Sequence, residues 1–576
     1  MTIAIDPVKR ELVKNALITI CDNMIVMVIR TSRSTVVKNN LDFSGCILDA
    51  DGVLVVQGLS LPAHLGSTMP AMKGCLDHFG DDIHEGDILC NNDPYAGASH
   101  LNDLFMFLPV FVDGKRIAFV SLILHHTDMG GRVPGGNATD STEIFQEGLR
   151  IPPLKIYERG KPNKTLLRIL EHNVRVSDRV MGDIFSQISG LQSAERDFRK
   201  RIAEYGAATL TAYMADLIDY CERLTRANIR GLPNGTAEFD EWADDDGAGG
   251  PPVRFHVKVT IRDEDIEVDF TGTSPQTSGA INPNYWFTVS MTYAALRTVM
   301  DVDLPTNAGF YKPISVIAPE GSFVNPRFPA PFGARGLAGY RIRTAINGAL
   351  AKLLPDRMPA CIGSSEFAVV FAGYRSDRRP FLLLEFHNVS GAGGGPVLDG
   401  QDAGPYCLAN VANVPVEIIE AENPVRVERY GFLPDSEGAG KFRGALGIVR
   451  EYRLLADEAT VQLRSDRQDH PPYGLFGGAS GAPGRTYLNP GTPEAATLPS
   501  KFIRTLRRGE VLRGELPGSG GWGNAAERDP TTVAEDVKQQ KISLARARDV
   551  YRVAVDPHDF AVDAAATAAL RAAAAD

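Results

Sequence analysis

Residues 117–131 read IAFVSLILHHTDMGG, and this stretch joins a buried strand to a group of metal-ligating side chains. The apolar run 117–124 is typical of a strand in the interior of a sheet. It ends in His125 and His126, and Asp128 follows just before two glycines. A strand is a rigid support, so polar side chains at its end are well placed to form a metal site.

A second polar cluster, SHLND at 99–103, lies upstream of this strand. Its His100 and Asp103 are three residues apart, and the chain has only 11 histidines in 576 residues. Imidazole nitrogens and carboxylate oxygens are the ligands that catalytic divalent transition metals prefer. The pattern therefore predicts a metal site formed by His100, Asp103 and one of the two adjacent histidines.

The roles within the second cluster stay open on spacing alone. Neighbouring residues of a strand point to opposite faces, so His125 and His126 do not both enter one site if the strand continues through them. The other histidine would then support a ligand or the fold. Asp128 has two interpretations, either holding a ligand or a water in place or starting the turn at Gly130.

Asp42 is a fourth candidate ligand. It lies just before residues 46–55, CILDADGVLV, where the segment 49–52 predicts the turn of a β-hairpin. Asp49 and Asp51 are accordingly expected to be solvated turn residues. The small residues of the loop 90–98, which leads into His100, allow the backbone to approach a ligand closely.

Length and composition indicate a multidomain enzyme of the soluble type. A chain of 576 residues exceeds one ordinary core, and its 44% apolar and 23% charged residues are ordinary values. A net charge of −11 without a basic block argues against nucleic acid or a membrane surface as partner. Seven scattered cysteines without a CxxC pair, and the lack of a signal pattern or of an uninterrupted apolar run of membrane-spanning length, predict a cytoplasmic protein.

The predicted fold class is α+β, with a strand-rich metal-binding core, long helices and a β-rich C-terminal half. Four regions are expected: 1–160 with the N-terminal helix and the metal-binding strands, 161–235 helical, 236–485 mixed with glycine-rich loops, and 486–576 with an alanine-rich tail. Helical periodicity marks 7–28, 164–206 (as one long helix), 210–229, 288–301 and 340–354, and strand patterns mark 236–273 and 360–480.

The sequence lacks the motifs of a nucleotide-binding protein. It contains no Walker motif, no GxSxG elbow and no dinucleotide fingerprint after a strand. The glycine-rich run 517–523 is not followed by the Lys-Ser/Thr pair that a phosphate-binding loop requires. The chain by itself therefore does not look like an ATP-binding subunit.

Several motifs together resemble the hydantoinase B/5-oxoprolinase family. They are NDPY at 92–95, HLND at 100–103, HHTDMGG at 125–131, NPVRVE and GAGKFRG within 423–444, and RSDR at 464–467. They occur in order along nearly the whole chain. Members of this family include the metal-bearing subunits of ATP-dependent hydantoinases, caprolactamase-like and N-methylhydantoinase-like enzymes among them, halves of 5-oxoprolinases, and subunits of acetone and acetophenone carboxylases.

This resemblance implies a division of labour between two subunits. A partner of the hydantoinase A type would bind ATP and phosphorylate the amide oxygen of a small cyclic substrate, and a water at the metal of this chain would attack the activated carbon. Carried over by motif, the ligands are Asp42, His100, Asp103 and His125, which leaves His126 and Asp128 as candidate catalytic or supporting residues. The implied assembly is a hetero-oligomer such as α2β2.

Elementary chemistry agrees with this division. An amide is a poor electrophile because its nitrogen donates electrons into the carbonyl group, and O-phosphorylation removes that donation. A water bound to a divalent metal has a pKa lowered to about 7 and is nucleophilic at neutral pH. A ligand set of two histidines and two aspartates suits Zn, Mn, Fe or Co.

Three functions are compatible with these observations. The first is the metal-dependent subunit of an ATP-dependent hydrolase acting on a lactam, a hydantoin or 5-oxoproline. The second is a subunit of an ATP-dependent ketone carboxylase. The third is a non-catalytic subunit in which the His/Asp cluster is structural.

Overall fold

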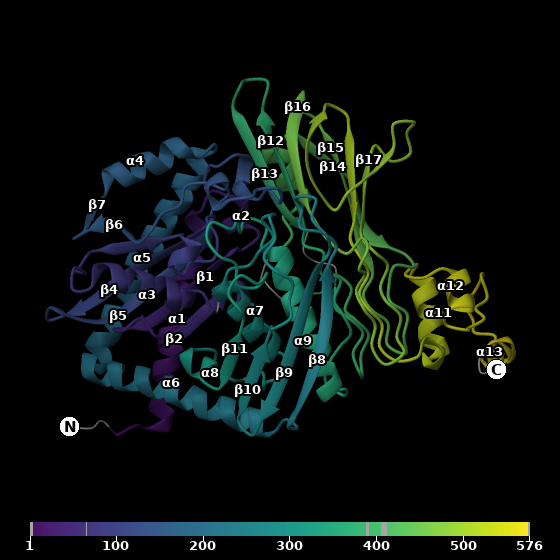
Figure 1. The fold of residues 1–576 in the computed structure, drawn as a ribbon, viewed down its shortest axis with the longest axis horizontal. Coiled ribbons are helices and arrows are strands. Elements are labelled where there is room, and N and C mark those ends of the chain that lie inside the picture. Colours follow the sequence, from purple (N-terminus) through teal and green to yellow (C-terminus); the bar gives the residue numbers. More distant parts are fainter. Residues whose placement is uncertain (1–3, 65, 388–390, 405–411, 574–576) are drawn as a thin grey trace.

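The computed structural model describes residues 4–64, 66–387, 391–404 and 412–573. Within these ranges the protein combines four β-sheets with long helices, which confirms the predicted α+β class (Figure 1). The six described cysteines are all buried and free, and Cys407 lies outside the described residues.

The N-terminal part is built on a sheet with the strand order β2-β1-β5-β4-β3-β6-β7. Its strands are β1 (Phe43–Asp49), β2 (Leu54–Ser60), β3 (Ile88–Asn91), β4 (Asp103–Val112), β5 (Lys115–His125), β6 (Leu154–Glu158) and β7 (Lys161–Pro162). The predicted hairpin at 46–55 is confirmed, since β1 pairs with β2 and Asp49 accepts hydrogen bonds from the turn amides of Asp51 and Val53, both at 2.9 Å. The central strands β4 and β5 are almost entirely buried, as their apolar sequences require.

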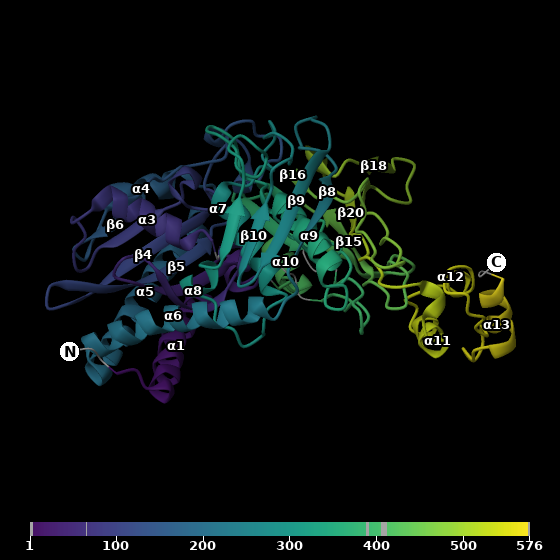
Figure 2. The same ribbon diagram turned by 60° about the horizontal axis from the view of Figure 1, so that its bottom comes forward.

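Helices cover this sheet (Figures 1 and 2). They are α1 (Pro7–Thr31), α2 (Thr35–Lys38), α3 (Thr68–Phe79), α4 (Lys164–Asn173), α5 (Ser177–Tyr205) and α6 (Ala207–Arg230). Helix α1 begins as predicted, with Asp6 accepting a hydrogen bond from the amide of Val8 at 2.8 Å.

Among the described residues, α1 is the one helix long and apolar enough to cross a membrane, judged by length and composition alone. The same test is passed by the core helix of a folded domain. Seven of its side chains are buried inside the protein: Val13, Leu17, Ile20, Cys21, Met24, Ile25 and Val28.

The single helix expected over 164–206 is wrong, because the chain leaves the helical conformation between α4 and α5. Val174 is extended, with φ −110° and ψ 147°. The amide of Arg175 then donates to the carboxylate of Asp128 at 2.6 Å instead of to a helical carbonyl. A tertiary hydrogen bond thus replaces the helical one at this point. The hydrophobic periodicity of the sequence does not show such a break.

A second sheet with the order β11-β10-β9-β8 packs beside the first. It consists of β8 (Gly235–Ala243), β9 (Val253–Arg262), β10 (Asp265–Asp269) and β11 (Ile314–Ile317), with helices α7 (Tyr285–Arg297), α8 (Ala308–Tyr311) and α9 (Gly336–Leu353). Alternate residues of β9 are buried, as the sequence pattern predicts.

Two further sheets form the C-terminal half. One has the order β13-β12-β16-β19 and the other β14-β15-β20-β17-β18. Their strands are β12 (Phe367–Tyr374), β13 (Pro380–His387), β14 (Val425–Leu433), β15 (Gly447–Leu454), β16 (Glu458–Arg464), β17 (Arg485–Leu488), β18 (Ala496–Leu498), β19 (Lys501–Arg507) and β20 (Val511–Glu515), and α10 (Val416–Glu422) precedes β14. The chain ends in α11 (Pro530–Lys538), α12 (Leu544–Asp549) and α13 (Ala564–Ala572), which project from one end of the molecule (Figure 2).

The apolar cores relate these parts to one another. One cluster runs from Val13 in α1 to Phe386 in β13 and includes residues of both the first and the second sheet. A second cluster lies between the two C-terminal sheets, and a third joins Ala439 to the terminal helices. The division into four regions stays a prediction.

Candidate metal centre

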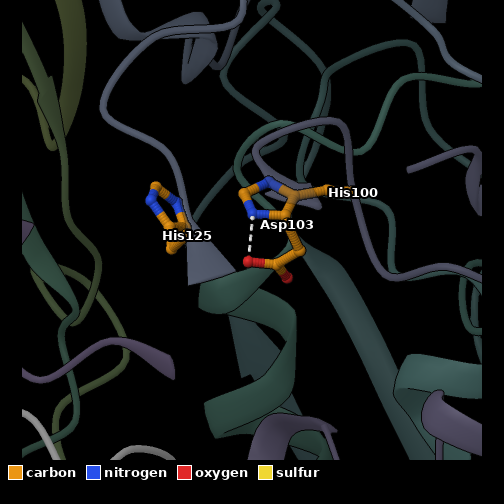
Figure 3. Close-up of side chains that lie close together, drawn as sticks. All are labelled: His100, Asp103 and His125. Atoms are coloured by element: carbon orange, nitrogen blue, oxygen red, sulfur yellow. Dashed lines mark ion pairs between the residues drawn. The ribbon is translucent and has the colours of Figure 1, made fainter. Parts of the chain in front are cut away.

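His100, Asp103 and His125 converge at one end of the N-terminal sheet (Figure 3). Asp103 begins β4 and His125 ends β5, and the two are direct partners in the antiparallel register. Directly opposed residues project from the same face of a sheet. His100 lies in the turn that enters β4, where its carbonyl accepts a hydrogen bond from the amide of Asp103 at 3.1 Å. One donor atom from each residue lies within 4.8 Å of the other two, and all three residues are buried.

The unpaired atoms of this triad fit a metal ion. Oδ2 of Asp103 accepts a hydrogen bond from Nη2 of Arg335 at 2.7 Å and lies 3.3 Å from Nε2 of His64. Its Oδ1 lies 3.3 Å from Nε2 of His100, but neither atom has a hydrogen-bond partner, and Nδ1 of His125 also lacks one. Buried polar atoms are almost always paired, so unpaired atoms on all three residues of this group require an explanation. A divalent transition metal provides one, because each of these atoms carries a lone pair that coordinates it.

The protonation states are those that a metal requires. Burial, assisted by the charge of Arg335, lowers the pKa of His100 to about 4, and burial lowers the pKa of His125 well below its usual range. Burial alone would raise the pKa of Asp103, but His100, His64 and Arg335 hold it well below its ordinary value. The two imidazoles are therefore neutral and the carboxylate is charged, which leaves all three free to act as ligands.

Asp42 lines the same cavity. Its backbone carbonyl accepts a hydrogen bond from the amide of His125 at 3.1 Å, which fixes the segment before β1 beside the end of β5. Its carboxylate is not part of the group within 4.8 Å. Burial and the nearby charge of Asp103 raise the pKa of Asp42 to about 7. The structure thus brings Asp42 to the cavity wall, and its role as a fourth ligand stays a prediction.

His126 and Asp128 do not line this cavity. His126 is buried, and burial lowers its pKa against the opposing influence of Asp183 and Gln187 on α5. The carboxylate of Asp128 accepts hydrogen bonds from the amides of Gly135 and Arg175 and from the guanidinium of Arg175, at 2.9, 2.6 and 3.1 Å. These contacts favour a supporting role for Asp128 in the loop after β5. The catalytic assignment of both residues stays a prediction.

The sequence did not predict four arginine, histidine or glutamate residues that line the cavity: His64, Arg335, Glu366 and Arg464. His64 ends the short 3-10 helix η1 (Pro62–His64), and its Nδ1 lies 2.8 Å from Oγ of Ser44. Arg335 precedes α9 and also donates to Oγ of Ser99 at 2.8 Å. These residues come from separate segments, so no local spacing reveals them. Arg464 is the partial exception, because it begins the RSDR run.

The sequence and the fold together define the class of protein. The family model described as Hydantoinase B/oxoprolinase matches residues 6–525. The chain is 32% identical to the caprolactamase subunit beta of Pseudomonas jessenii, over 99% of each chain. It is 30% identical to 5-oxoprolinase 1 of Arabidopsis thaliana over 86% of this chain, and this match spans 40% of that protein. The chain belongs to the hydantoinase B/oxoprolinase family.

Solved structures agree with this assignment. The crystal structure of the ATP-dependent caprolactamase from Pseudomonas jessenii superposes with a TM-score of 0.93 at 30% identity, covering 99% of this chain and 100% of that one. A nucleotide-free acetone carboxylase superposes with a TM-score of 0.92 at 19% identity, covering 99% of this chain and 83% of that one. The second likeness shows a shared fold.

Proposed function

We propose that this chain is the metal-dependent subunit of an ATP-dependent hydrolase that opens a cyclic amide, such as a lactam, a hydantoin or 5-oxoproline. One observation carries the proposal: His100, Asp103 and His125 converge in a buried cavity, and each of them has a buried polar atom without a hydrogen-bond partner. A relative with the same fold over its full length is a subunit of an ATP-dependent caprolactamase. The sequence has no nucleotide-binding motif, so ATP is used by a partner subunit of the hydantoinase A type, in an assembly such as α2β2.

The triad and Asp42 would hold a divalent transition metal: Zn, Mn, Fe or Co. When bound, the metal supplies Lewis acidity and lowers the pKa of a coordinated water to about 7. Arg335 and His64 hold Oδ2 of Asp103, which orients Oδ1 towards the site. The amide reaches this chain already O-phosphorylated, and its carbon is then open to attack by water.

The remaining walls of the cavity suit such a substrate. Arg335 and Arg464 bring two buried guanidinium groups to it, and planar guanidinium groups bind phosphoryl oxygens well. Phe287 and Phe386 provide apolar surface for the ring carbons. The cavity thus offers separate surfaces for the charged and the apolar parts of an O-phosphorylated cyclic amide.

Co-expression with the ATP-binding partner tests the proposal. We expect the complex to open at least one lactam, hydantoin or 5-oxoproline ring in an ATP-dependent assay, and the isolated chain to open none. Ring opening by the isolated chain without ATP would contradict the two-subunit reaction. Product formation from a ketone and bicarbonate, with every cyclic amide inert, would identify a carboxylase instead.

A further inference from the structure

The cavity contains a carboxylate that has no place in the expected ligand set, that of Glu366. This residue lies directly before β12 and is buried, with 7% of its surface exposed. Its Oε1 lies 3.3 Å from Nη2 of Arg464, and its Oε2 has no hydrogen-bond partner. Glu366 therefore presents one unengaged oxygen in the cavity that also contains the triad.

The backbone around Glu366 is held in an unfavourable conformation. Ser364 and Glu366 both have positive φ angles, 32° and 44°, in the left-handed region that residues with a side chain rarely adopt. Such strain persists only where the surroundings enforce it, and it is concentrated at functional sites. Gly336 at the start of α9 makes room for the side chain, because a Cβ atom there would lie 1.8 Å from Oε1 of Glu366.

We propose that Glu366 is the catalytic residue that carries protons to the ring nitrogen during cleavage of the C–N bond. This inference rests on the proposed function. Water adds to the carbon of the O-phosphorylated amide, and the electron pair of the C=N bond moves to nitrogen. As the tetrahedral intermediate collapses, the C–N bond breaks and gives an amine and an acyl phosphate. A second water then cleaves the acyl phosphate to a carboxylate and phosphate.

Both protons of the first water end on the nitrogen in this scheme. When water attacks, the acid form of Glu366 gives one proton to nitrogen and is restored by a proton from the attacking oxygen. When the intermediate collapses, Glu366 gives nitrogen its second proton and is restored by the proton of the new hydroxyl group. The nitrogen leaves as a neutral amine, and no other reactant is needed.

Four other polar groups of the cavity are less suited to this task, and Asp42, whose pKa is also raised, is the expected fourth metal ligand. Guanidinium groups do not release protons in proteins, which excludes Arg335 and Arg464. Asp103 is engaged by Arg335 and the triad, and both ring nitrogens of His64 have neighbours at 2.8 and 3.3 Å. Burial raises the pKa of Glu366 against the opposing charges of Arg464 and Arg335, which makes its acid form more accessible. A proton carrier works best when its pKa is close to the working pH.

The proton carrier decides which group the intermediate expels. Without a second proton on nitrogen the C–N bond does not break, and loss of phosphate from the tetrahedral intermediate, whose nitrogen carries one proton, returns the intact cyclic amide. We therefore expect the Glu366→Gln complex to open its substrate about 10²-fold more slowly or worse. Consumption of ATP should fall much less, so the ATP hydrolysed per ring opened should rise. The bound metal per chain should stay at the wild-type level.

The matched control is Glu385→Gln. Glu385 is also a buried glutamate paired with an arginine, Arg450 at 3.1 Å, but it does not line the cavity. This variant should keep the wild-type ratio of ATP hydrolysed to rings opened. If Glu366→Gln does not fold, Gly336→Ala displaces the same carboxylate, and it should raise the ratio in the same way.

Two outcomes separate the inference from the proposed function. A wild-type complex that opens no cyclic amide with ATP overturns the proposed function and the inference together. A wild-type complex that opens rings, combined with a Glu366→Gln variant (or Gly336→Ala in its place) of unchanged rate and ratio, overturns the role of Glu366 alone.

Discussion

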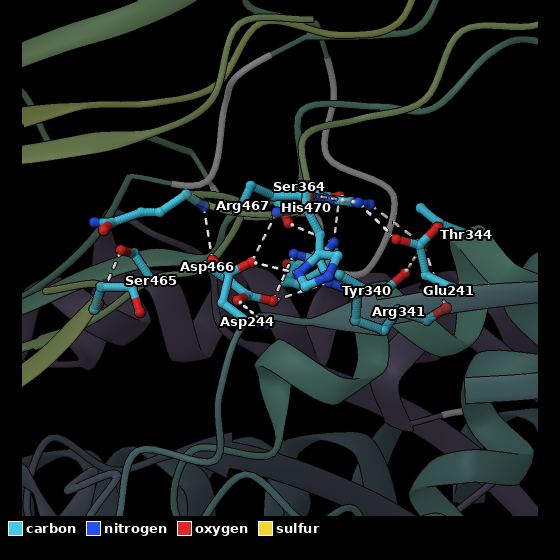
Figure 4. A network of polar contacts seen from close by, with 12 residues as sticks. Glu241, Asp244, Tyr340, Arg341, Thr344, Ser364, Ser465, Asp466, Arg467 and His470 are labelled. Atoms are coloured by element: carbon cyan, nitrogen blue, oxygen red, sulfur yellow. Dashed lines mark hydrogen bonds and ion pairs between the residues drawn. The ribbon is translucent and has the colours of Figure 1, made fainter. Parts of the chain in front are cut away.

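Two buried aspartates, Asp103 and Asp466, are held by arginines at or near the start of the same helix, yet they lie in very different surroundings. Oδ2 of Asp466 accepts two hydrogen bonds from Arg341 on α9, at 2.9 and 2.6 Å, and its Oδ1 accepts one from the amide of Asp244 at 2.9 Å (Figure 4). Asp103 is held by Arg335 through Oδ2 only, and its Oδ1 has no donor. Burial and charge are common to both, so Asp103 is distinguished by an unpaired oxygen that lies beside two histidines with unpaired nitrogens.

Asp466 is fully hydrogen-bonded because it belongs to a larger polar network. Arg467 donates to Glu241 of β8 at 2.6 Å, and Asp244 accepts hydrogen bonds from the amides of Gln468 and His470 at 2.7 and 3.0 Å (Figure 4). These contacts join the second sheet to the loop after β16. The RSDR run thus divides between two tasks, with Arg464 in the cavity and Asp466 and Arg467 in a structural junction.

Removing a ligand from the triad should have the largest effect on activity. We expect His100→Ala to lower ring opening by more than about 100-fold, because loss of even an outer-shell partner costs about 10- to 100-fold. ATP use by the partner should be at least partly retained, since phosphorylation takes place on the other subunit. The assay follows product and ADP in parallel.

The same variant also tests a structural role for the cluster. Substantial ring opening by a folded His100→Ala complex that is verified free of metal would mean that the triad is structural. If the variant unfolds, Asp103→Asn replaces it, because asparagine keeps the shape of the side chain.

Removing Asp466 should instead weaken the fold. Asp466→Asn leaves Arg341 buried without its counter-charge and Lys501 paired with Asp245 alone, and breaking a buried pair such as Arg341–Asp466 costs about 3–5 kcal/mol. The variant should still bind metal. Chemical denaturation measures the loss in the free energy of unfolding. A variant that loses metal binding but keeps its stability would show that Asp466 belongs to the metal centre and not to a structural network.

This stability difference should depend on pH. Burial alone would raise the pKa of Asp466, but Arg341 and Lys501 lower it far below its usual value of 3.8. A lowered carboxylate pKa stabilises the fold above the unfolded pKa, and this contribution is lost as the pH falls towards the folded pKa. The difference in the free energy of unfolding between wild type and Asp466→Asn should thus be constant above about pH 5 and should shrink below about pH 3.8.

A smaller effect is expected for the residues that orient the ligands. His64→Ala removes one of the two neighbours of Oδ2 of Asp103 and should weaken metal binding by about 10- to 100-fold. His470→Ala is the matched control, because its Nδ1 lies 3.1 Å from Asp244 in the structural network. Competition with a chelator measures both affinities, and equal affinities would show that His64 does not orient Asp103.

Local patterns predicted His100, Asp103 and one of the two adjacent histidines, and the family resemblance selected His125, but neither predicted the surroundings of this triad. His100, Asp103 and His125 lie at or just before the ends of two strands that are consecutive in the sequence, so local spacing brings their segments together. His64, Arg335 and Glu366 come from segments that meet only in the tertiary structure. The break between α4 and α5 was not predicted for the same reason, since it depends on a residue distant in the sequence. The carboxylate of Asp128 accepts a hydrogen bond from the amide of Arg175, which therefore does not bond to a helical carbonyl.

The metal centre is tested most directly by anomalous diffraction from crystals of the metal-loaded wild-type protein. We expect a single strong peak about 2.0–2.2 Å from one ligand atom each of His100, Asp103 and His125. Asp42 should complete the coordination, and the peak should vanish in His100→Ala crystals. A peak at another place, or a cavity without metal in a complex that still opens its substrate, would contradict this expectation.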